Sequence, residues 1–287
     1  MSHLSFSQMT SYMRCSKSYQ LSRLQHAPQT PAVWSFAGRA LHEALNDIHN
    51  HHFTGDLPNI GVLWTKRFDE ELTAQVENTG VPPEQWKKAG RQTKDKPNRE
   101  DVAWWRQDGL RQLNDYYAWL RNSGWTLLGD GDAPYSEIEV SGDFHGQHVK
   151  AFLDAVMVNP QGLMTVVDFK SGTRTPKSPT QLALYSVLLE QTMDLTVPYG
   201  AFMMTRKTEM TDPIDLSRWN AIWFEQQFSR LRYAVDQGIF MPNLGDACFT
   251  CDVADSCYAN GGFQAFRYDP DHPSHATYNS DLTDDLI

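Results

Sequence analysis

The chain of 287 residues is 40% hydrophobic and 21% charged, a composition typical of globular proteins with a sizeable core. Its formal net charge of −10 excludes a surface that is basic throughout, so a nucleic-acid partner would need a local basic groove. No run approaches the roughly 20 apolar residues of a membrane span. The first residues also lack the apolar core of a secretory signal, so we expect a cytoplasmic protein without membrane contact.

The first part of the chain is predicted to be mainly helical. Residues 5–50 repeat apolar side chains at intervals of three and four, and residues 60–77 and 101–121 form two further amphipathic patterns. A loop rich in proline and basic residues joins them at 78–100. The sequence "IHNHH" at 48–52 lacks the ligand spacing of a zinc site, and we interpret it as a solvated helix end.

Alternating apolar and polar residues from about residue 135 predict strands. Runs at 135–144, 148–158 and 163–170 are separated by a His-Gly turn and by the turn "NPQG". Ser178 and Pro179 are typical of a helix start, so the next element should be a helix. A further strand at 198–206 and a long helix at 216–237 follow, and the whole pattern indicates an α/β protein.

The second of these hairpins carries charged residues where a sheet interior is expected. A turn centred on Gln161 completes a nearly uniform apolar face on one side. On the other side it sets Asp154 opposite Asp168, with Lys170 one step away. Two adjacent carboxylates repel unless a proton or a cation joins them, and hard oxygen ligands favour Mg²⁺ or Mn²⁺. An ion pair at a sheet edge, with a second aspartate nearby, is the alternative interpretation.

These residues resemble the core of the PD-(D/E)XK nuclease superfamily, in which an aspartate on one strand is followed by D/E-x-K on the next. Here the matching residues are Asp154 and the "DFK" of residues 168–170. The helix after them carries "QLALY", which places Gln181 and Tyr185 on one face, as in the RecB-like branch. Upstream, "GRALHEAL" resembles the G-x-x-x-H element of that branch and contains His42.

The resemblance implies specific roles for these residues. The implied metal ligands are three side chains and one main-chain carbonyl, those of His42, Asp154, Asp168 and Phe169. The implied catalytic residues are Asp154, Asp168, Lys170, Gln181 and Tyr185. Lys170 would position the attacking water, while Gln181 and Tyr185 would orient the lysine or the substrate backbone. A glutamate that often opens this sheet would be Glu137 or Glu139, and an exposed strand carboxylate is the alternative for both.

Four cysteines follow a one-plus-three pattern: Cys15 stands near the N-terminus, while Cys248, Cys251 and Cys257 form C-x₂-C-x₅-C. In a reducing compartment such thiols are better explained by a metal than by disulfides. Zinc ribbons usually use two C-x₂-C pairs. The pattern here resembles the iron–sulfur subset of RecB-like nucleases, which includes CRISPR-associated exonucleases and AddB-type helicase–nucleases. That resemblance implies a structural [4Fe–4S] cluster, with Zn²⁺ or unligated thiols as the alternatives.

Basic and aromatic residues in the loop after residue 80 suit single-stranded DNA, because cations contact phosphates and rings stack on bases. The candidate DNA-binding residues are Trp86, Lys87, Lys88, Arg91 and Lys94. The alternative is a solvated loop whose tryptophans belong to the helix core.

We expect one nuclease domain over residues 1–267, followed by a polar acidic tail at 268–287. Residues 1–130 would form a helical part, 131–210 the catalytic sheet core, and 211–267 a helix and the iron–sulfur segment. The fold implied by the resemblance is a restriction-endonuclease-like mixed sheet flanked by helices.

The combined pattern predicts a metal-dependent DNA exonuclease, and the resemblance implies single-stranded ends as its substrate. One alternative is a partner-dependent subunit that trims DNA ends in CRISPR adaptation or recombination. Another is a non-catalytic iron–sulfur DNA-binding protein. The joint presence of Asp154, Asp168, Lys170 and Gln181 argues against this last alternative.

Overall fold

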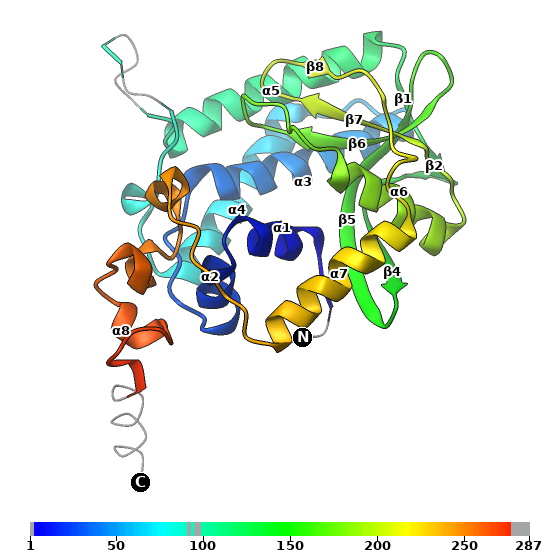
Figure 1. Ribbon diagram of the computed structural model, residues 1–287. Helices are drawn as coiled ribbons and strands as arrows, with labels where there is room; N and C mark the ends of the chain where they lie inside the picture. The colour runs from blue at the N-terminus through cyan, green and yellow to red at the C-terminus, as the bar shows by residue number, and fades with distance from the viewer. Residues whose placement is uncertain (1–2, 91–92, 95–98, 277–287) are drawn as a thin grey trace. The chain divides into compact units, whose positions relative to one another are not determined.

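A computed structural model describes residues 3–90, 93–94 and 99–276 (Figure 1). The chain divides into two compact units, each described by itself below. Unit 1 combines Met1–Thr30 with Glu225–Ile287, and unit 2 is the continuous segment Pro31–Phe224. Within the described segments, no helix has both the length and the apolar character that crossing a bilayer requires.

Unit 2 contains long helices with clear start and stop signals. They are α3 (Val33–Phe53), α4 (Ile60–Thr79), α5 (Val102–Asn122) and α6 (Thr180–Met193), with a short 3₁₀ turn, η2 (Pro83–Gln85), after α4; a further helix, α7 (Ala221–Asp236), contains the boundary with unit 1. The side chain of Asn59 caps α4 and that of Asp101 caps α5, each by accepting an amide hydrogen bond of the first turn. Gly80 ends α4 in the left-handed conformation.

The strands of unit 2 are β1 (Thr126–Leu127), β2 (Gly129–Asp130), β3 (Ala133–Pro134), β4 (Ser136–Phe144), β5 (Gln147–Val158), β6 (Met164–Lys170), β7 (Tyr199–Met204), β8 (Glu209–Met210) and β9 (Ile214–Asp215). Within the described part of the chain, seven of them form one sheet in the order β1-β5-β6-β7-β8. β4 also pairs with β5, and β9 with β7. β6 and β7 are parallel and are joined through α6, whereas their neighbours pair antiparallel. The expected mixed sheet flanked by helices is confirmed.

The two faces of the sheet differ as predicted. Ala155, Val167 and Phe169 share one apolar core with residues of α3, α4 and α5. The opposite face is covered by α6, where Leu182 packs so closely on β7 that a Cβ at Gly200 would lie 2.8 Å from it. Because side chains alternate along a strand, the charged residues of β5 and β6 lie outside the apolar core.

The register predicted from a turn centred on Gln161 is confirmed, since Ala155 pairs with Val167 and the pairing continues to Val158 and Met164. Away from the turn, the ladder ends at the pair Ala155–Val167. Two residues beyond Val167, the amide of Phe169 donates instead to the carboxylate of Asp154, at 2.7 Å from Oδ2. The backbone pairing of the two strands therefore stops at the two aspartates.

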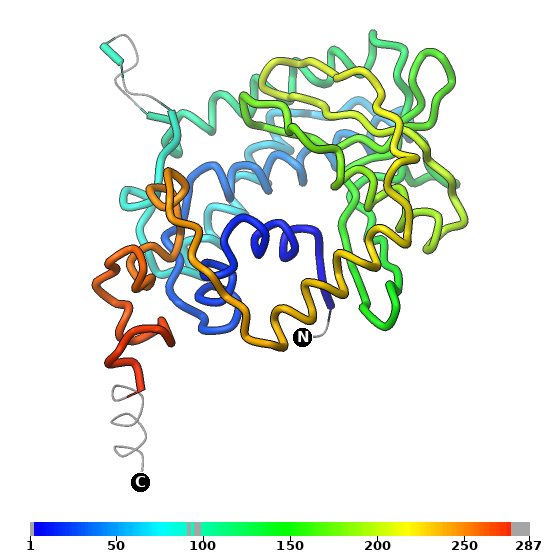
Figure 2. Tube along the Cα trace, in the orientation of Figure 1, coloured from blue at the N-terminus to red at the C-terminus, as the bar shows by residue number. Residues whose placement is uncertain are grey.

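Unit 1 consists of short elements from both ends of the chain, coloured blue and yellow to red in Figure 2. They are α1 (Phe6–Arg14), α2 (Ser16–Tyr19), η1 (Gln20–Leu24), η3 (Asp246–Thr250), η4 (Ala254–Ser256), η5 (Tyr258–Asn260) and α8 (Ala265–Tyr268).

A buried ion pair joins the two segments of unit 1. Lys17 Nζ lies 3.2 Å from Asp269 and 2.7 Å from Asp271. Asp269 also accepts the amide of Tyr258 at 2.8 Å. The packed part of the chain thus includes the first residues of the tail expected at 268–287, of which residues 277–287 lie outside the described residues.

Candidate metal and catalytic site

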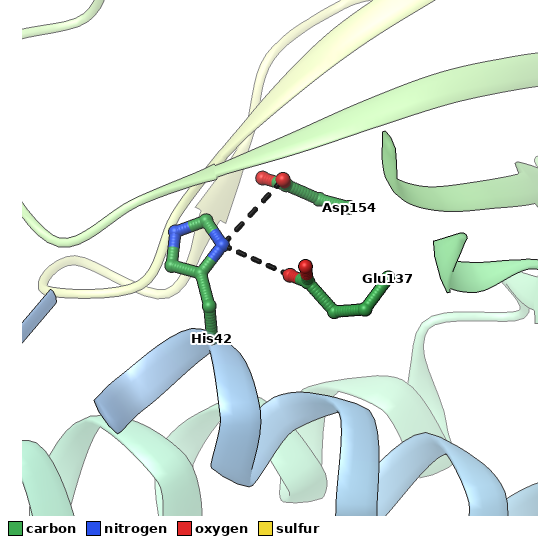
Figure 3. A group of neighbouring side chains, drawn as sticks. All are labelled: His42, Glu137 and Asp154. Carbon is green, nitrogen blue, oxygen red and sulfur yellow. Dashed lines mark hydrogen bonds and ion pairs between the residues drawn. The ribbon is translucent and has the colours of Figure 1, made fainter. Parts of the chain in front are cut away.

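His42 brings two carboxylates together at one end of the β4–β5 hairpin. Its Nδ1 lies 3.1 Å from Glu137 Oε1 and 3.5 Å from Asp154 Oδ1 (Figure 3). One ligand atom from each residue lies within 4.8 Å of the other two. An octahedral cation with ligand distances of about 2.1 Å separates opposite ligands by roughly 4 Å. The three donors therefore fit one small divalent cation.

The three side chains of this triad shift one another's pKa, and burial acts on each of them as well. Burial favours neutral His42, yet the charges and hydrogen bonds of Asp154 and Glu137 raise its pKa well above the usual value. Burial likewise disfavours ionised Asp154, but His42 and the Phe169 amide lower its pKa. Burial and the neighbouring Asp154 raise the pKa of Glu137. These pKa shifts favour proton sharing among the three side chains, whose nitrogen and oxygen atoms are also donors that a divalent cation can bind.

The structure distinguishes the two candidate glutamates. Glu139 faces Lys150, with 2.7 Å between Oε1 and Nζ, and its side chain is 46% exposed. Glu137 instead points to His42, and its backbone is left-handed with φ of 50°. That conformation costs a non-glycine residue roughly 1 kcal/mol or more, so the surrounding structure must hold it.

A second set of side chains connects β6 to α6. Lys170 Nζ lies 2.6 Å from Asp168 Oδ2 and donates to Gln181 Oε1 at 3.4 Å. Gln181 Nε2 in turn donates to the hydroxyl of Tyr185 at 2.7 Å. Burial raises the pKa of Tyr185 well above its usual value, so its hydroxyl stays protonated. The lysine, glutamine and tyrosine form one connected row beside the aspartates.

Asp168 is fully buried; the ammonium of Lys170 lies 2.6 Å from its Oδ2, and within the described chain its Oδ1 has no hydrogen-bond partner. Burial and the nearby charge of Asp154 raise its pKa to about 7, although the ion pair with Lys170 opposes that shift. Buried carboxylate oxygens without hydrogen-bond donors are costly unless a cation neutralises them. This donor chemistry also fits a divalent metal.

The structure therefore brings together most of the residues predicted for the site. His42 and Asp154 lie in the triad, while Asp168 lies beside Lys170 and outside the group of three. Glu137 was not among the predicted ligands. The signal was available in the His-Gly turn, because His145 and Gly146 both have positive φ, as a two-residue type I′ hairpin requires.

That turn sets Ser136 opposite Ala155 and Ile138 opposite Leu153. The same register leaves Glu137 facing Asp154.

The interpretation of "IHNHH" as a solvated helix end is wrong for His49. His49 is fully buried, with Nδ1 2.7 Å from Ser136 Oγ and Nε2 2.7 Å from the hydroxyl of Tyr116. Burial lowers its pKa to about 3. The apolar spacing of α3 contained the signal, because residues 41, 45 and 48 are buried and position 49 lies on the same face.

Trp86 is not available for stacking on a base, which corrects its assignment to a DNA-binding loop. Its side chain is 3% exposed, its Nε1 donates to the carbonyl of Val81 at 2.8 Å, and its ring packs against Phe36. Lys87 and Lys88 follow it and are half-buried, and Lys94 is exposed. Arg91 lies outside the described residues.

The four cysteines lie around one cavity of unit 1. Cys15, Cys248, Cys251 and Cys257 all line it, together with Leu21 and Val253, and none of the four forms a disulfide. The amide of Asn243 donates to Cys15 Sγ at 3.4 Å.

The spacing of the thiols bears on the metal that they fit. In a tetrahedral zinc site with Zn–S bonds of about 2.3 Å, neighbouring sulfurs are roughly 3.8 Å apart. In the described part of the chain, no three thiols gather within 4.8 Å.

Comparison with known proteins adds to this geometry. The family described as the PD-(D/E)XK nuclease superfamily matches residues 3–258. The Gene 69 protein of Mycobacterium phage D29 is 27% identical over 263 residues, which cover 88% of this chain and 95% of that protein. The solved structure of SSO0001 is 16% identical and covers 55% of this chain and 75% of its own, with a TM-score of 0.32. At that score the likeness adds nothing to the fold described above.

Proposed function

The chain belongs to the PD-(D/E)XK nuclease superfamily, and we propose that it is a metal-dependent exonuclease that hydrolyses single-stranded DNA from its ends. The observation that carries this proposal is the position of the His42–Glu137–Asp154 triad near a buried Asp168–Lys170 pair. The superfamily implies hydrolysis of a nucleic acid. The choice of single-stranded ends extends the resemblance of the motifs to RecB-like nucleases.

The proposed ligands of Mg²⁺ or Mn²⁺ are the side chains of four residues and one main-chain carbonyl, those of His42, Glu137, Asp154, Asp168 and Phe169. When bound, a divalent cation lowers the pKa of a water and neutralises charge on the phosphate. Asp154 is oriented for this role by the Phe169 amide, which occupies its second oxygen. His42 would hold the cation through a deprotonated nitrogen of its neutral imidazole.

Lys170 is the proposed water-positioning residue. Its ammonium group already has two acceptors, Asp168 and Gln181, which fix the direction of its third N–H. That donor can hold a water or a phosphate oxygen, and the side chain is 30% exposed to solvent. In the reaction, the water oxygen bonds to phosphorus and the bond from phosphorus to the leaving sugar oxygen breaks. The water supplies the proton that the leaving oxygen gains.

For unit 1 we propose a [4Fe–4S] cluster bound by Cys15, Cys248, Cys251 and Cys257. One cavity lined by all four thiols supports a shared inorganic group, and the one-plus-three pattern of the cysteines favours this occupant over zinc. The proposed role is structural, because ligands from the two ends of the chain would restrict the unfolded state.

The nuclease proposal is tested by digestion of end-labelled single-stranded DNA in Mn²⁺ with anaerobically purified protein. Unsubstituted protein should shorten the DNA progressively from one end, and Lys170→Ala should abolish the loss. Lys150→Ala is the matched control, because Lys150 pairs with exposed Glu139 and should leave the activity intact. Internal cleavage of a circular single strand at the same rate would contradict the exonuclease assignment, and equal activity of Lys170→Ala would contradict the site.

A further inference from the structure

Glu137 reaches His42 and Asp154 from a backbone conformation that L-residues rarely adopt. Its φ is 50°, and it lies between two residues that keep regular pairing, Ser136 with Ala155 and Ile138 with Leu153. A glutamate at this φ would relax to ordinary strand geometry unless a neighbouring residue were fixed. The residue that is fixed is Ser136.

Two buried side chains, those of His49 and Tyr116, restrain Ser136. Its hydroxyl lies 2.7 Å from His49 Nδ1, and His49 Nε2 lies 2.7 Å from the hydroxyl of Tyr116. Ser136 is 6% exposed, and His49 and Tyr116 are fully buried. Because both ring nitrogens are bonded, the ring of His49 cannot turn without breaking a buried hydrogen bond.

The helix α3 relates this restraint to the triad. His42 and His49 are seven residues apart, about two helical turns, so both project from the same face. The ring of Phe169 lies between them, with its centroid 6.4 Å from that of His42 and 5.5 Å from that of His49. One histidine therefore contacts Glu137, while the other holds the residue before it.

We propose that His49 is a positioning residue for the metal site, which acts through Ser136 to keep Glu137 in the left-handed conformation that directs its carboxylate to His42 and Asp154. This role rests on the proposed function, because it presupposes that the triad binds a divalent cation. Partners that orient a metal ligand typically change metal affinity by 10- to 100-fold. His49 is not itself a proposed ligand; its hydrogen bond to Ser136 acts on Glu137, while its ring contact with Phe169 is one that the aromatic side chain of His49→Phe can keep.

The test is the Kd of Mn²⁺ measured by electron paramagnetic resonance on the full chain. Ser136→Ala and His49→Phe should each raise the Kd about 10-fold. Ser186→Ala is the matched control, because it removes a hydrogen bond of 2.6 Å to the carbonyl of Val197 elsewhere in unit 2. It should leave the Kd within about twofold of the unsubstituted value.

A double-mutant cycle separates positioning from general damage to the fold. In a Glu137→Gln background, adding Ser136→Ala or His49→Phe should not raise the Kd further. An equal increase in both backgrounds would overturn the proposal, as would unchanged Kd values in the single variants. Absence of saturable Mn²⁺ binding by unsubstituted protein would overturn the proposed function, and this role with it. Mn²⁺ binding that only Glu137→Gln weakens would overturn the role of His49 alone.

Discussion

Gln181 bonds to Tyr185 one helical turn later, and the 2.7 Å contact fixes which end of the amide faces Lys170. The amide nitrogen donates to the tyrosine hydroxyl, so the amide oxygen is left to accept from the lysine at 3.4 Å. Tyr185 thus governs the position of an ammonium group that it does not touch.

Tyr185→Phe should lower kcat roughly 10-fold with little change in KM, because the freed amide can turn its nitrogen toward Lys170. Steady-state digestion of a labelled single strand measures both constants. Gln191→Ala, on the exposed side of the same helix, is the control and should behave as unsubstituted protein. Equal losses in both variants would indicate damage to α6 rather than a lost orientation.

Asp168→Asn should abolish hydrolysis while stabilising the metal-free protein. The pKa of Asp168 rises to about 7 on folding from an ordinary value near 3.8. Between those values the native state holds a proton that the unfolded state has lost, so stability falls as pH rises from about 4 to 7. The asparagine does not ionise and should add about 1 to 4 kcal/mol at neutral pH.

All nine tryptophans lie between residues 34 and 223, so urea unfolding followed by tryptophan fluorescence reports unit 2. A metal-free Asp168→Asn protein that is less stable than the unsubstituted one at pH 7 would contradict the prediction. Added Mn²⁺ should narrow or reverse the difference, since it stabilises the protein with the intact carboxylate.

His49 should make unit 2 sensitive to acid. Its pKa falls from 6.5 to about 3 on folding, so between these values only the unfolded state binds the proton. Stability therefore falls as pH is lowered below 6.5, by about 1.4 kcal/mol per pH unit from this residue. His49→Phe should lose that slope between pH 6 and 4, whereas exposed His148→Phe should retain it. Parallel pH profiles for the three proteins would count against a buried neutral imidazole.

Cys248→Ser should remove iron from the protein and make unit 1 sensitive to proteolysis, because one of the four cavity-lining thiols is lost. Metal analysis and limited proteolysis with mass spectrometry measure the two effects. Cleavage should be confined to residues 1–30 and 225–276, with unit 2 protected. Recovery of zinc instead of iron from anaerobically purified protein would identify the alternative occupant.

Lys17→Met should destabilise unit 1 by about 3 kcal/mol, because it leaves the buried carboxylate of Asp269 without its cation. Hydrogen exchange in the 1–30 segment provides the measurement. Asp236→Asn breaks the exposed pair with Arg232 and should cost less than about 1 kcal/mol. If the two variants exchange alike, the buried pair is not what joins the segments.

The second hairpin was predictable because its register is set by local chemistry. One alignment completes an apolar face and also brings Asp154 and Asp168 level with each other just beyond the last pair, and a shift by one residue would destroy both features. The end of backbone pairing at Asp154 and Asp168 was not predictable, because it depends on the Phe169 amide donating to the Asp154 side chain and not to a carbonyl of the facing strand.

The residues that escaped prediction depend on long-range packing. The His-Gly turn could have aligned Glu137 with Asp154, but the positive φ that directs its carboxylate to His42 has no signature in its residue type. Trp86 lies beside lysines in sequence, but it is buried against α3 through Phe36, fifty residues earlier. The lysines beside Trp86 in the sequence indicated a solvent-exposed loop, whereas its contacts in the folded protein make this tryptophan part of the core.

Unit 1 is made of two segments from opposite ends of the chain, so it can form only late in synthesis. Lys17 and Asp269 are 252 residues apart, a delay of roughly 10 to 50 s at the usual rates of translation. Residues 31–224 emerge within that time, so unit 2 can fold while the N-terminal segment still lacks its partner. The proposed cluster needs Cys248, Cys251 and Cys257 beside Cys15, so it could be inserted only into a chain that is almost complete.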